Sequence, residues 1–358
     1  MTTTVRDTCV KQIFLLHRCI ISMHFDNPVI HIFDPRQFGG NLIFNGGFFT
    51  PPSIEHNTSG SFLCVYRTTP SIAEWYESSI RIITLCAGRD DEKKELVPVP
   101  HTDRLLVAHG EDPRVVALTN RHILVTYTEV NRLNTRAIIK GQVFLADYVK
   151  NQYKFVKQLT FDLNCSSQNK QKNWNFFVDP YTQHVLLIYR IMPFELYDLG
   201  HINHLLFAPA DLYEKESHVM ECMLRTSLIH RQFWKHPFSD MLLLRGGSNP
   251  VYIREGEFYM FVHSATYKMF CLVMTRTEKN KKWHITKVGN RPIVYHDVDT
   301  YKGQIHFPVG GVYDATKRVF HVCLGLEDQN LGYVVLDKGW VDTHLEDVEN
   351  IVPPPICL

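Results

Sequence analysis

A short stretch of charged and turn-forming residues, Gly110-Glu111-Asp112-Pro113-Arg114, directly precedes the apolar run Val115-Val116-Ala117-Leu118. A carboxylate beside a guanidinium at the start of a strand has the residue types of a site for acid–base chemistry. Arg114 can hold a neighbouring carboxylate in a fixed fork. Pro113 biases Asp112 towards an extended conformation, which would aim its side chain. On these residues alone, an ordinary polar turn before a strand is the alternative.

The composition is that of a globular chain without a dominant charge. The 358 residues are 45% hydrophobic, which is enough apolar material for one large domain or two medium ones. The 38 basic and 37 acidic residues give a formal net charge of +1, so no global field favours nucleic acid or an anionic membrane. We therefore expect neither as a partner, although a local basic pocket is compatible with this balance.

The cysteines and histidines do not have the spacing of a metal site. The nine cysteines contain no Cys-x-x-Cys pair and the 19 histidines no His-Glu-x-x-His motif, so we predict reduced thiols, no metal and no resident cofactor. His17-Arg18 interrupts the apolar run near the N-terminus and no cleavage site follows, so we expect no signal peptide. No span is apolar enough to cross a bilayer, and the expected location is the cytoplasm.

Short runs rich in Val, Ile, Tyr and Phe recur along the chain, separated by Gly, Pro, Asn and Asp. Examples are residues 61–66, 80–85, 122–127, 184–189 and 319–324. No Pro-, Gly- or Ser-rich linker divides the chain. We predict an all-β protein with a single domain over residues 1–358, in which residues 1–40 and 334–358 are terminal extensions or closure strands.

Several of these runs form a weak repeat of paired strands. A turn with Asn, Asp or Gly opens a first strand, and a second strand ends in an aromatic and a polar residue, with Val262-His263 a less regular ending. The openings lie at 44–47, 111–114, 172–174, 247–250 and 306–310, and the endings at 66–67, 127–128, 189–190, 262–263 and 324–328. The five units predict a five-bladed β-propeller whose inner strands deliver polar residues to a central funnel. A β-sandwich is the alternative, because evenly spaced strands suit it too.

Taken together, these openings and endings resemble the glycoside phosphorylase family that acts on β-mannosides. They also resemble the related mannosyltransferase/phosphorylases of β-1,2-mannan reserves in trypanosomatid parasites. The resemblance runs from about Phe44 to Asp328 and consists of several short motifs in order. Those families share a five-bladed propeller with the active site on its axis, so the resemblance implies that fold here.

The resemblance also implies roles for particular residues. Asp112 falls on the family's catalytic acid. The expected substrate-binding residues are Asn45, Gly46, Arg67, Arg114 and Asp328, and the expected phosphate-binding residues are Lys172, Asn173, Arg190 and His263. The family's turn has proline where this chain has Gly46, which loosens the match at that turn.

The chemistry is coherent with these residue types. An inverting phosphorylase needs one carboxylic acid, because phosphate is already a charged nucleophile and no base is needed to activate water. Cations and donors at the phosphate position are needed instead. Asp112 would protonate the departing glycosidic oxygen; in the family the proton is thought to pass through a mannose hydroxyl. In the reverse direction Asp112 would act as base while mannose 1-phosphate donates.

We therefore expect inverting mannosyl transfer on β-1,2-linked oligomannosides, with inorganic phosphate as co-substrate and mannose or mannose 1-phosphate as partners. GDP-mannose has the same α-linked phosphate at carbon one, so phosphorylase and nucleotide-sugar transferase both stay open. A hydrolase on the same fold would need a second carboxylate, for which Glu111, Asp179 and Glu255 are the candidates. A non-catalytic carbohydrate-binding propeller would keep aromatic walls without needing Asp112. The oligomannose length and the oligomeric state also stay open.

Overall fold

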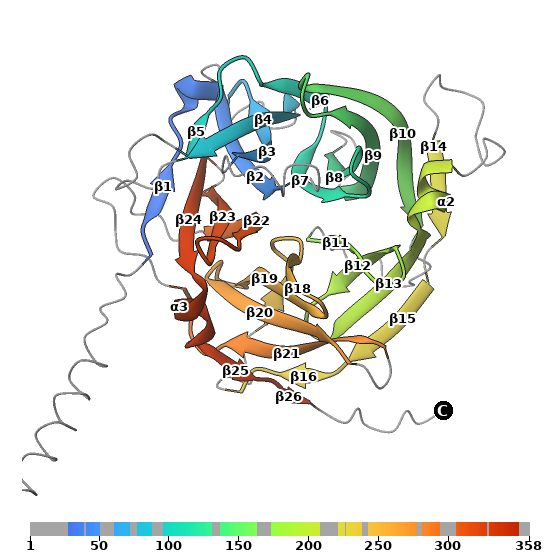
Figure 1. Ribbon diagram of the computed structural model, residues 1–358, viewed down its shortest axis with the longest axis vertical. Helices are drawn as coiled ribbons and strands as arrows, with labels where there is room; N and C mark the ends of the chain where they lie inside the picture. The colour runs from blue at the N-terminus through green and yellow to red at the C-terminus, as the bar shows by residue number, and fades with distance from the viewer. Residues whose placement is uncertain are drawn as a thin grey trace, which may run out of the picture.

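The computed structural model describes residues 28–38, 41–50, 61–71, 77–87, 96–130, 137–162, 173–207, 221–225, 227–237, 243–277, 281–293, 306–327 and 329–350. Strands dominate these residues and form five sheets around a common axis, as Figure 1 shows. The predicted five-bladed β-propeller is therefore confirmed, and the β-sandwich alternative is wrong.

The first three blades follow one another along the chain. Blade I contains β2 (Leu42–Phe49), β3 (Ser61–Thr69), β4 (Ser79–Ala87), β5 (Leu96–Pro98) and β6 (Arg104–Val107). Blade II contains β7 (Glu111–Ala117), β8 (His122–Val130), β9 (Ala137–Asp147), β10 (Gln152–Asp162) and β14 (Glu221–Arg225). Blade III contains β11 (Asn175–Val178), β12 (His184–Arg190), β13 (Phe194–His201) and β15 (Ser227–Gln232), and α2 (Ile202–Phe207) follows β13.

The last two blades use strands from both ends of the described chain. Blade IV contains β17 (Leu244–Arg245), β18 (Val251–Arg254), β19 (Glu257–Ser264), β20 (Met269–Arg276), β21 (Trp283–Gly289) and β25 (Leu345–Asp347). Blade V contains β22 (His306–Asp314), β23 (Val319–Leu326), β24 (Asn330–Asp337) and β1 (Ile30–Ile32). Smaller elements are η1 (Pro35–Phe38), α3 (Lys338–Asp342) and the pair of β16 (Trp234–Lys235) with β26 (Glu349–Asn350). Because β1 pairs with β24, the N-terminal strand completes the last blade (Figure 1).

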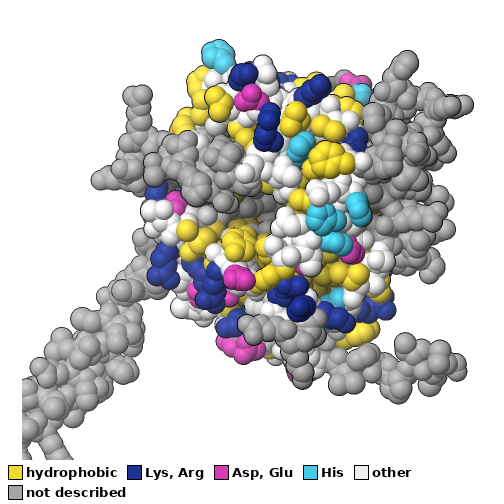
Figure 2. Space-filling view, turned by 45° about the vertical axis from the view of Figure 1, so that its right-hand side comes forward, with side chains coloured by type: hydrophobic (Ala, Val, Ile, Leu, Met, Phe, Trp, Pro, Cys, Tyr) yellow, Lys and Arg dark blue, Asp and Glu magenta, His cyan; other side chains and the backbone are white. Residues whose placement is uncertain are grey.

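The hydrophobic core lies between neighbouring blades. In β12, Val185 and Leu187 pack towards blade II, whereas Leu186 and Ile188 pack towards blade IV. Both faces of such a strand are buried, and this explains the continuous apolar runs in the sequence. Similar clusters fill the contacts between blades I and II, IV and V, and V and I. Lys and Arg side chains and Asp and Glu side chains both lie on the face shown in Figure 2.

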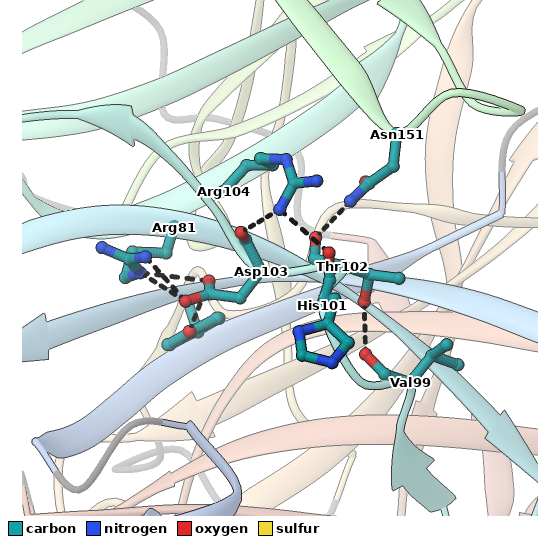
Figure 3. Close-up of polar contacts among 8 residues, drawn as sticks. Arg81, Val99, His101, Thr102, Asp103, Arg104 and Asn151 are labelled. Atoms are coloured by element: carbon teal, nitrogen blue, oxygen red, sulfur yellow. Dashed lines mark hydrogen bonds and ion pairs between the residues drawn. The ribbon is translucent and has the colours of Figure 1, made fainter.

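A polar cluster holds the connection between β5 and β6 to its neighbours (Figure 3). The Asp103 carboxylate accepts from Arg81 Nε at 2.9 Å and from the Tyr66 hydroxyl at 2.9 Å. Asn151 Nδ2, in the β9–β10 turn of blade II, donates to Thr102 O at 2.6 Å. The contact therefore links the outer strands of blades I and II. It lies at the opposite end of the strands from Asp112.

Near the axis, two inner strands approach backbone to backbone. A Cβ atom added to Gly310 of β22 would lie 2.7 Å from Gly47 Cα and 2.9 Å from Phe48 N. A Cβ atom added to Gly47 would come no closer than 3.6 Å to its nearest neighbour. Glycine at 310 is thus required by the closeness of β2 and β22, whereas glycine at 47 is not.

We predict that Gly310→Ala lowers the free energy of unfolding by about 1–3 kcal/mol, because backbone atoms cannot move aside for the added methyl group. Gly47→Ala on the facing strand is the matched control and should stay within about 1 kcal/mol of the parent. Urea unfolding of the three proteins measures both. Equal stability of the two variants would contradict this account of the axis.

Candidate active site

The predicted strand openings and endings meet at one end of the ring. Register pairs Phe44 with Arg67 in blade I, and Arg245 with His263 in blade IV. In blade III, Asn175 pairs with Ile188, so the segment before β11 and the end of β12 lie at the same end of their sheet. The repeated units therefore deliver their polar residues to a shared region, as the sequence predicts.

Asp112 is held in a β-bulge at the opening of β7. The register shifts between Glu111 and Arg114, which face Thr128 and Thr126, so one extra residue is inserted. Asp112 takes up this bulge with a φ of 48°, and the expected extended conformation is therefore wrong. Aspartate tolerates this left-handed region better than most residues, which allows the bulge to outweigh the bias imposed by the following proline.

A matching bulge lies in the neighbouring inner strand. Asn45 of β2 has a φ of 47°, and the register of β2 against β3 shifts between Phe44 and Gly47. Asn45 Nδ2 donates to Asp112 Oδ1 at 2.7 Å. Asp112 is partly exposed, whereas Asn45 is buried. The two bulges thus bring an amide against the carboxylate at the end of the ring.

Arg114 anchors the backbone around the acid. Its Nε donates to Gly247 O at 2.9 Å, and its Nη1 donates to Asp112 O at 3.1 Å and Pro113 O at 3.2 Å. The expected fork around a carboxylate is therefore wrong among the described residues, because the guanidinium takes carbonyl acceptors instead. Burial lowers the pKa of Arg114 to about 10, while the charge of Asp112 opposes that shift, so Arg114 stays cationic at neutral pH.

The neighbouring carboxylate belongs to a different ion pair. Glu111 Oε1 lies 2.8 Å from Arg67 Nη2, and both side chains are buried. The Arg67 guanidinium also lies over the Phe44 ring at 4.4 Å. A buried pair of this kind is costly to break from one side. Glu111 is thus engaged by Arg67, and the role of Arg67 in sugar binding stays a prediction.

His263 is buried and uncharged at neutral pH. Its Nδ1 lies 2.9 Å from Ser264 O and its Nε2 lies 3.2 Å from Asn173 Nδ2, so Nδ1 carries the proton and Nε2 accepts from the amide. The pKa of His263 is lowered to about 4, chiefly by burial and also by the charges of Arg245 and Arg114, while the hydrogen bond to the Ser264 carbonyl opposes the shift. Tyr267 stacks on the imidazole with ring centroids 5.2 Å apart.

Phe307 of β22 joins the acid's strand to His263. The Arg114 guanidinium lies 5.3 Å from the centre of the Phe307 ring, and the centre of the His263 ring lies 5.0 Å from the same point. Asp112, Arg114, Phe307, His263 and Asn173 therefore form one contiguous cluster.

The structure does not place the remaining predicted residues in this cluster. Arg190 Nε lies 4.0 Å from Glu195 Oε2, which also binds Arg231, and no contact among the described residues joins Arg190 to His263. Gly46 packs against Leu331 and Tyr66, where a Cβ atom would crowd both. Lys172 and Asp328 lie outside the residues that the structure describes.

One cation was missed from the sequence. Arg245 is exposed, pairs across β17 and β19 with His263, and lowers the pKa of that histidine. The sequence could have indicated Arg245 because it directly precedes the Gly246-Gly247 turn that opens the blade IV unit. A residue at that position pairs with the end of the second strand, here His263.

The carboxylates considered for a hydrolase do not join the cluster. Asp179 is buried at the far end of β11, where it accepts from Tyr181 N and Thr182 Oγ1 at 3.0 Å each. Glu255 is exposed in the turn between β18 and β19, again at the strand ends away from Asn173 and Ser248. Together with the engaged Glu111, these positions remove the sequence-based candidates for a water-activating base.

Among the described residues, no group of three or more His, Cys, Asp and Glu side chains could hold a metal ion. No helix among them is long and apolar enough to cross a membrane.

No family model matches the chain, and no curated protein matches it either. Solved structures do. The β-1,2-mannobiose phosphorylase from Listeria innocua, in complex with β-1,2-mannobiose, matches with a TM-score of 0.54 at 12% identity over 88% of this chain and 98% of its own. A mannose phosphorylase from Leishmania mexicana, in complex with phosphate ion, matches with a TM-score of 0.51 at 12% identity over 92% and 93% of the two chains.

The fold is that of the mannoside phosphorylases. A putative glycoside hydrolase from Parabacteroides distasonis shares it as well, with a TM-score of 0.53 at 11% identity over 88% of this chain and 94% of its own. The fold expected from the resemblance is thus confirmed, and the likeness at this identity concerns the fold alone.

His263 generates a pH-dependent stability. Its pKa is about 4 in the folded protein and about 6.5 in an unfolded chain, so the unfolded state binds more protons between these values. The free energy of unfolding should therefore fall as the pH falls from about 6.5 to about 4, by roughly 1–3 kcal/mol from this residue. His263→Gln should reduce the slope by about one proton in urea unfolding between pH 4 and 7. The exposed His204, replaced by Gln, is the control, and an unchanged slope in His263→Gln would contradict the assignment.

Proposed function

We propose that this protein is an inverting phosphorylase of β-mannosides that cleaves β-1,2-linked oligomannosides with inorganic phosphate. The observation that carries the proposal is the cluster in which the partly exposed Asp112 accepts from buried Arg114, and Phe307 links Arg114 to buried His263 and its partner Asn173. It supplies one available acid together with cations and donors, which is what phosphorolysis needs. The fold shared with phosphorylases of β-1,2-mannobiose and mannose supports the choice of substrate class.

In the proposed reaction, a phosphate oxygen attacks carbon one of the terminal mannose from the face opposite the leaving group. The bond between carbon one and the glycosidic oxygen breaks, and the proton of Asp112 passes to that oxygen. The products are α-mannose 1-phosphate and a shortened oligomannoside, and Asp112 is left ionised until it regains a proton. In the synthetic direction the ionised Asp112 takes the proton of the acceptor hydroxyl.

The phosphate is proposed to bind against His263, Asn173 and Arg245, with Lys172 and Arg190 completing the site. Arg245 is exposed and directly opposite His263, so it can meet an anion that arrives from solvent. His263 is uncharged and hydrogen-bonded on both nitrogens, which supports a fixed wall of the site formed with the stacked Tyr267.

The choice of phosphorolysis over hydrolysis is supported by the surroundings of Asp112. An inverting hydrolase places a second carboxylate about 6.5–9.5 Å from the acid to activate water. Glu111 is adjacent in sequence, but it is buried and paired with Arg67, so its charge is already compensated. GDP-mannose presents the same phosphate linkage and is the alternative donor.

We predict that the protein converts β-1,2-mannobiose and inorganic phosphate to mannose 1-phosphate, and that Asp112→Asn lowers kcat by about 10²–10⁴-fold while mannoside binding is kept. Asp147→Asn, in the β9–β10 turn of the same blade, is the matched control. A parallel incubation with GDP-mannose and mannose tests the transferase alternative, and release of free mannose without phosphate tests the hydrolase. Normal turnover by Asp112→Asn would remove this residue as the acid.

We also predict that Arg245→Gln and Arg190→Ala each raise the KM for phosphate by about tenfold, because each removes a cation from the proposed phosphate position. The KM for mannobiose should change little. Arg254→Gln, in the same blade as Arg245 but at the end of β18 away from it and ion-paired with Glu257, is the control. Initial rates over a phosphate series measure the effect, and an unchanged phosphate KM would take the replaced arginine out of the site.

A further inference from the structure

The side chain of Asn45 is almost closed off from solvent at the place where it meets Asp112. It is 3% exposed, so little of its amide is open to a sugar. Its Nδ2 donates to Asp112 Oδ1 at 2.7 Å, which is within the short range of charge-assisted hydrogen bonds. The buried amide of Asn45 therefore donates to Asp112, and little of it is left for a sugar.

The surroundings of Asn45 Oδ1 disfavour a flip of the side-chain amide. Asn45 Oδ1 has no hydrogen-bond partner among the described residues and points at Gly325, where a Cβ atom would overlap it. Flipping the amide would aim Oδ1 at the carboxylate, and two acceptors would then face each other. An unpaired buried acceptor is unfavourable for folding, so its presence beside the acid points to a role for the amide.

The backbone that carries Asn45 is equally constrained. Asn45 lies in the left-handed region, and Gly46 packs so closely on Leu331 and Tyr66 that no larger residue fits without movement. The inner strands β2 and β7, which carry Asn45 and Asp112, pack against each other. The donor is thus presented by a rigid strand of one blade to the acid of the next.

We propose that Asn45 is a positioning residue for Asp112, an inference that rests on the proposed function. Its Nδ2 fixes the orientation of the carboxylate by donating to Oδ1. The proton exchanged with the substrate then resides on Oδ2. Asn45 is accordingly assigned to the acid and not to the sugar, in contrast to the substrate-binding role expected from the sequence.

The test uses two variants that keep the backbone conformation. Asn45→Gly removes the donor at a residue type that tolerates a positive φ, and Asn45→Asp keeps the shape but replaces the donor with a second acid. Asn151→Gly is the matched control, because Asn151 also has a positive φ of 51° but lies in the outer β9–β10 turn.

In phosphorolysis of β-1,2-mannobiose, we expect Asn45→Gly to lower kcat by about 10–100-fold at nearly unchanged KM, the range of one hydrogen bond to a charged group. Asn45→Asp should lower kcat as well, since a carboxyl group in place of the amide offers no fixed amide donor to Oδ1 of Asp112. Asn151→Gly should change none of these quantities.

A second readout does not need turnover. The carboxyl carbon of Asp112 is followed by NMR in protein labelled with [¹³C]aspartate, and the Asp112→Asn spectrum identifies the signal. That signal should shift in Asn45→Gly and keep its position in Asn151→Gly, because only the first variant removes the donor to Oδ1. If the parent makes no mannose 1-phosphate, the proposed function fails, while this signal still decides the Asn45–Asp112 interaction. An unchanged signal in Asn45→Gly, or a raised KM for mannobiose with kcat intact, would overturn the proposal.

Discussion

The site depends on residues 246–249, the segment between β17 and β18, whose backbone accepts hydrogen bonds from other blades. Gly247 O accepts from Arg114 Nε of blade II at 2.9 Å and from Asn175 Nδ2 of blade III at 2.7 Å. Asn249 Nδ2 donates back to Val115 O of blade II at 2.9 Å. Backbone acceptors do not change rotamer, so the strand that carries the acid is fixed relative to the strand that carries His263 without help from the ligand.

The electrostatic design follows from that arrangement. A buried arginine near the axis is tolerable because all of its assigned hydrogen bonds go to carbonyl oxygens at 2.9–3.2 Å. Its charge, together with that of Arg245, discourages a proton on His263, and burial does so more strongly. A phosphate dianion placed beside His263 would act in the opposite sense, so anion binding and proton uptake at this histidine are physically coupled.

The sequence predicted what local chemistry determines. Turn residues and β-branched runs located the inner and second strands of every blade, and their repetition was enough for the propeller. What it did not predict depends on register between strands far apart. The Arg67–Glu111 pair spans 44 residues and the Arg114–Gly247 bond spans 133, and period-two patterns do not specify which residues meet across blades. The left-handed conformation of Asp112 was missed for the same reason, because it results from a bulge against β8 and not from its own neighbours.

In the proposed site, the role of Asp112 is the same for either phosphate donor, whereas the residues around His263 would have to differ. Phosphorolysis and transfer from a nucleotide sugar both make or break a bond between carbon one and a phosphate oxygen, so under the proposed function both would use Asp112 in the same position relative to the sugar. They differ in what lies beyond the phosphate. On this chain that region is bordered by the exposed Tyr267, which covers His263, and by the exposed Arg245. An inorganic phosphate needs only the cation there, while a nucleotide also needs an aromatic or apolar surface for its base. Under the proposed function, the two activities would therefore be distinguished by the residues outside His263, and not by the Asn45–Asp112 pair.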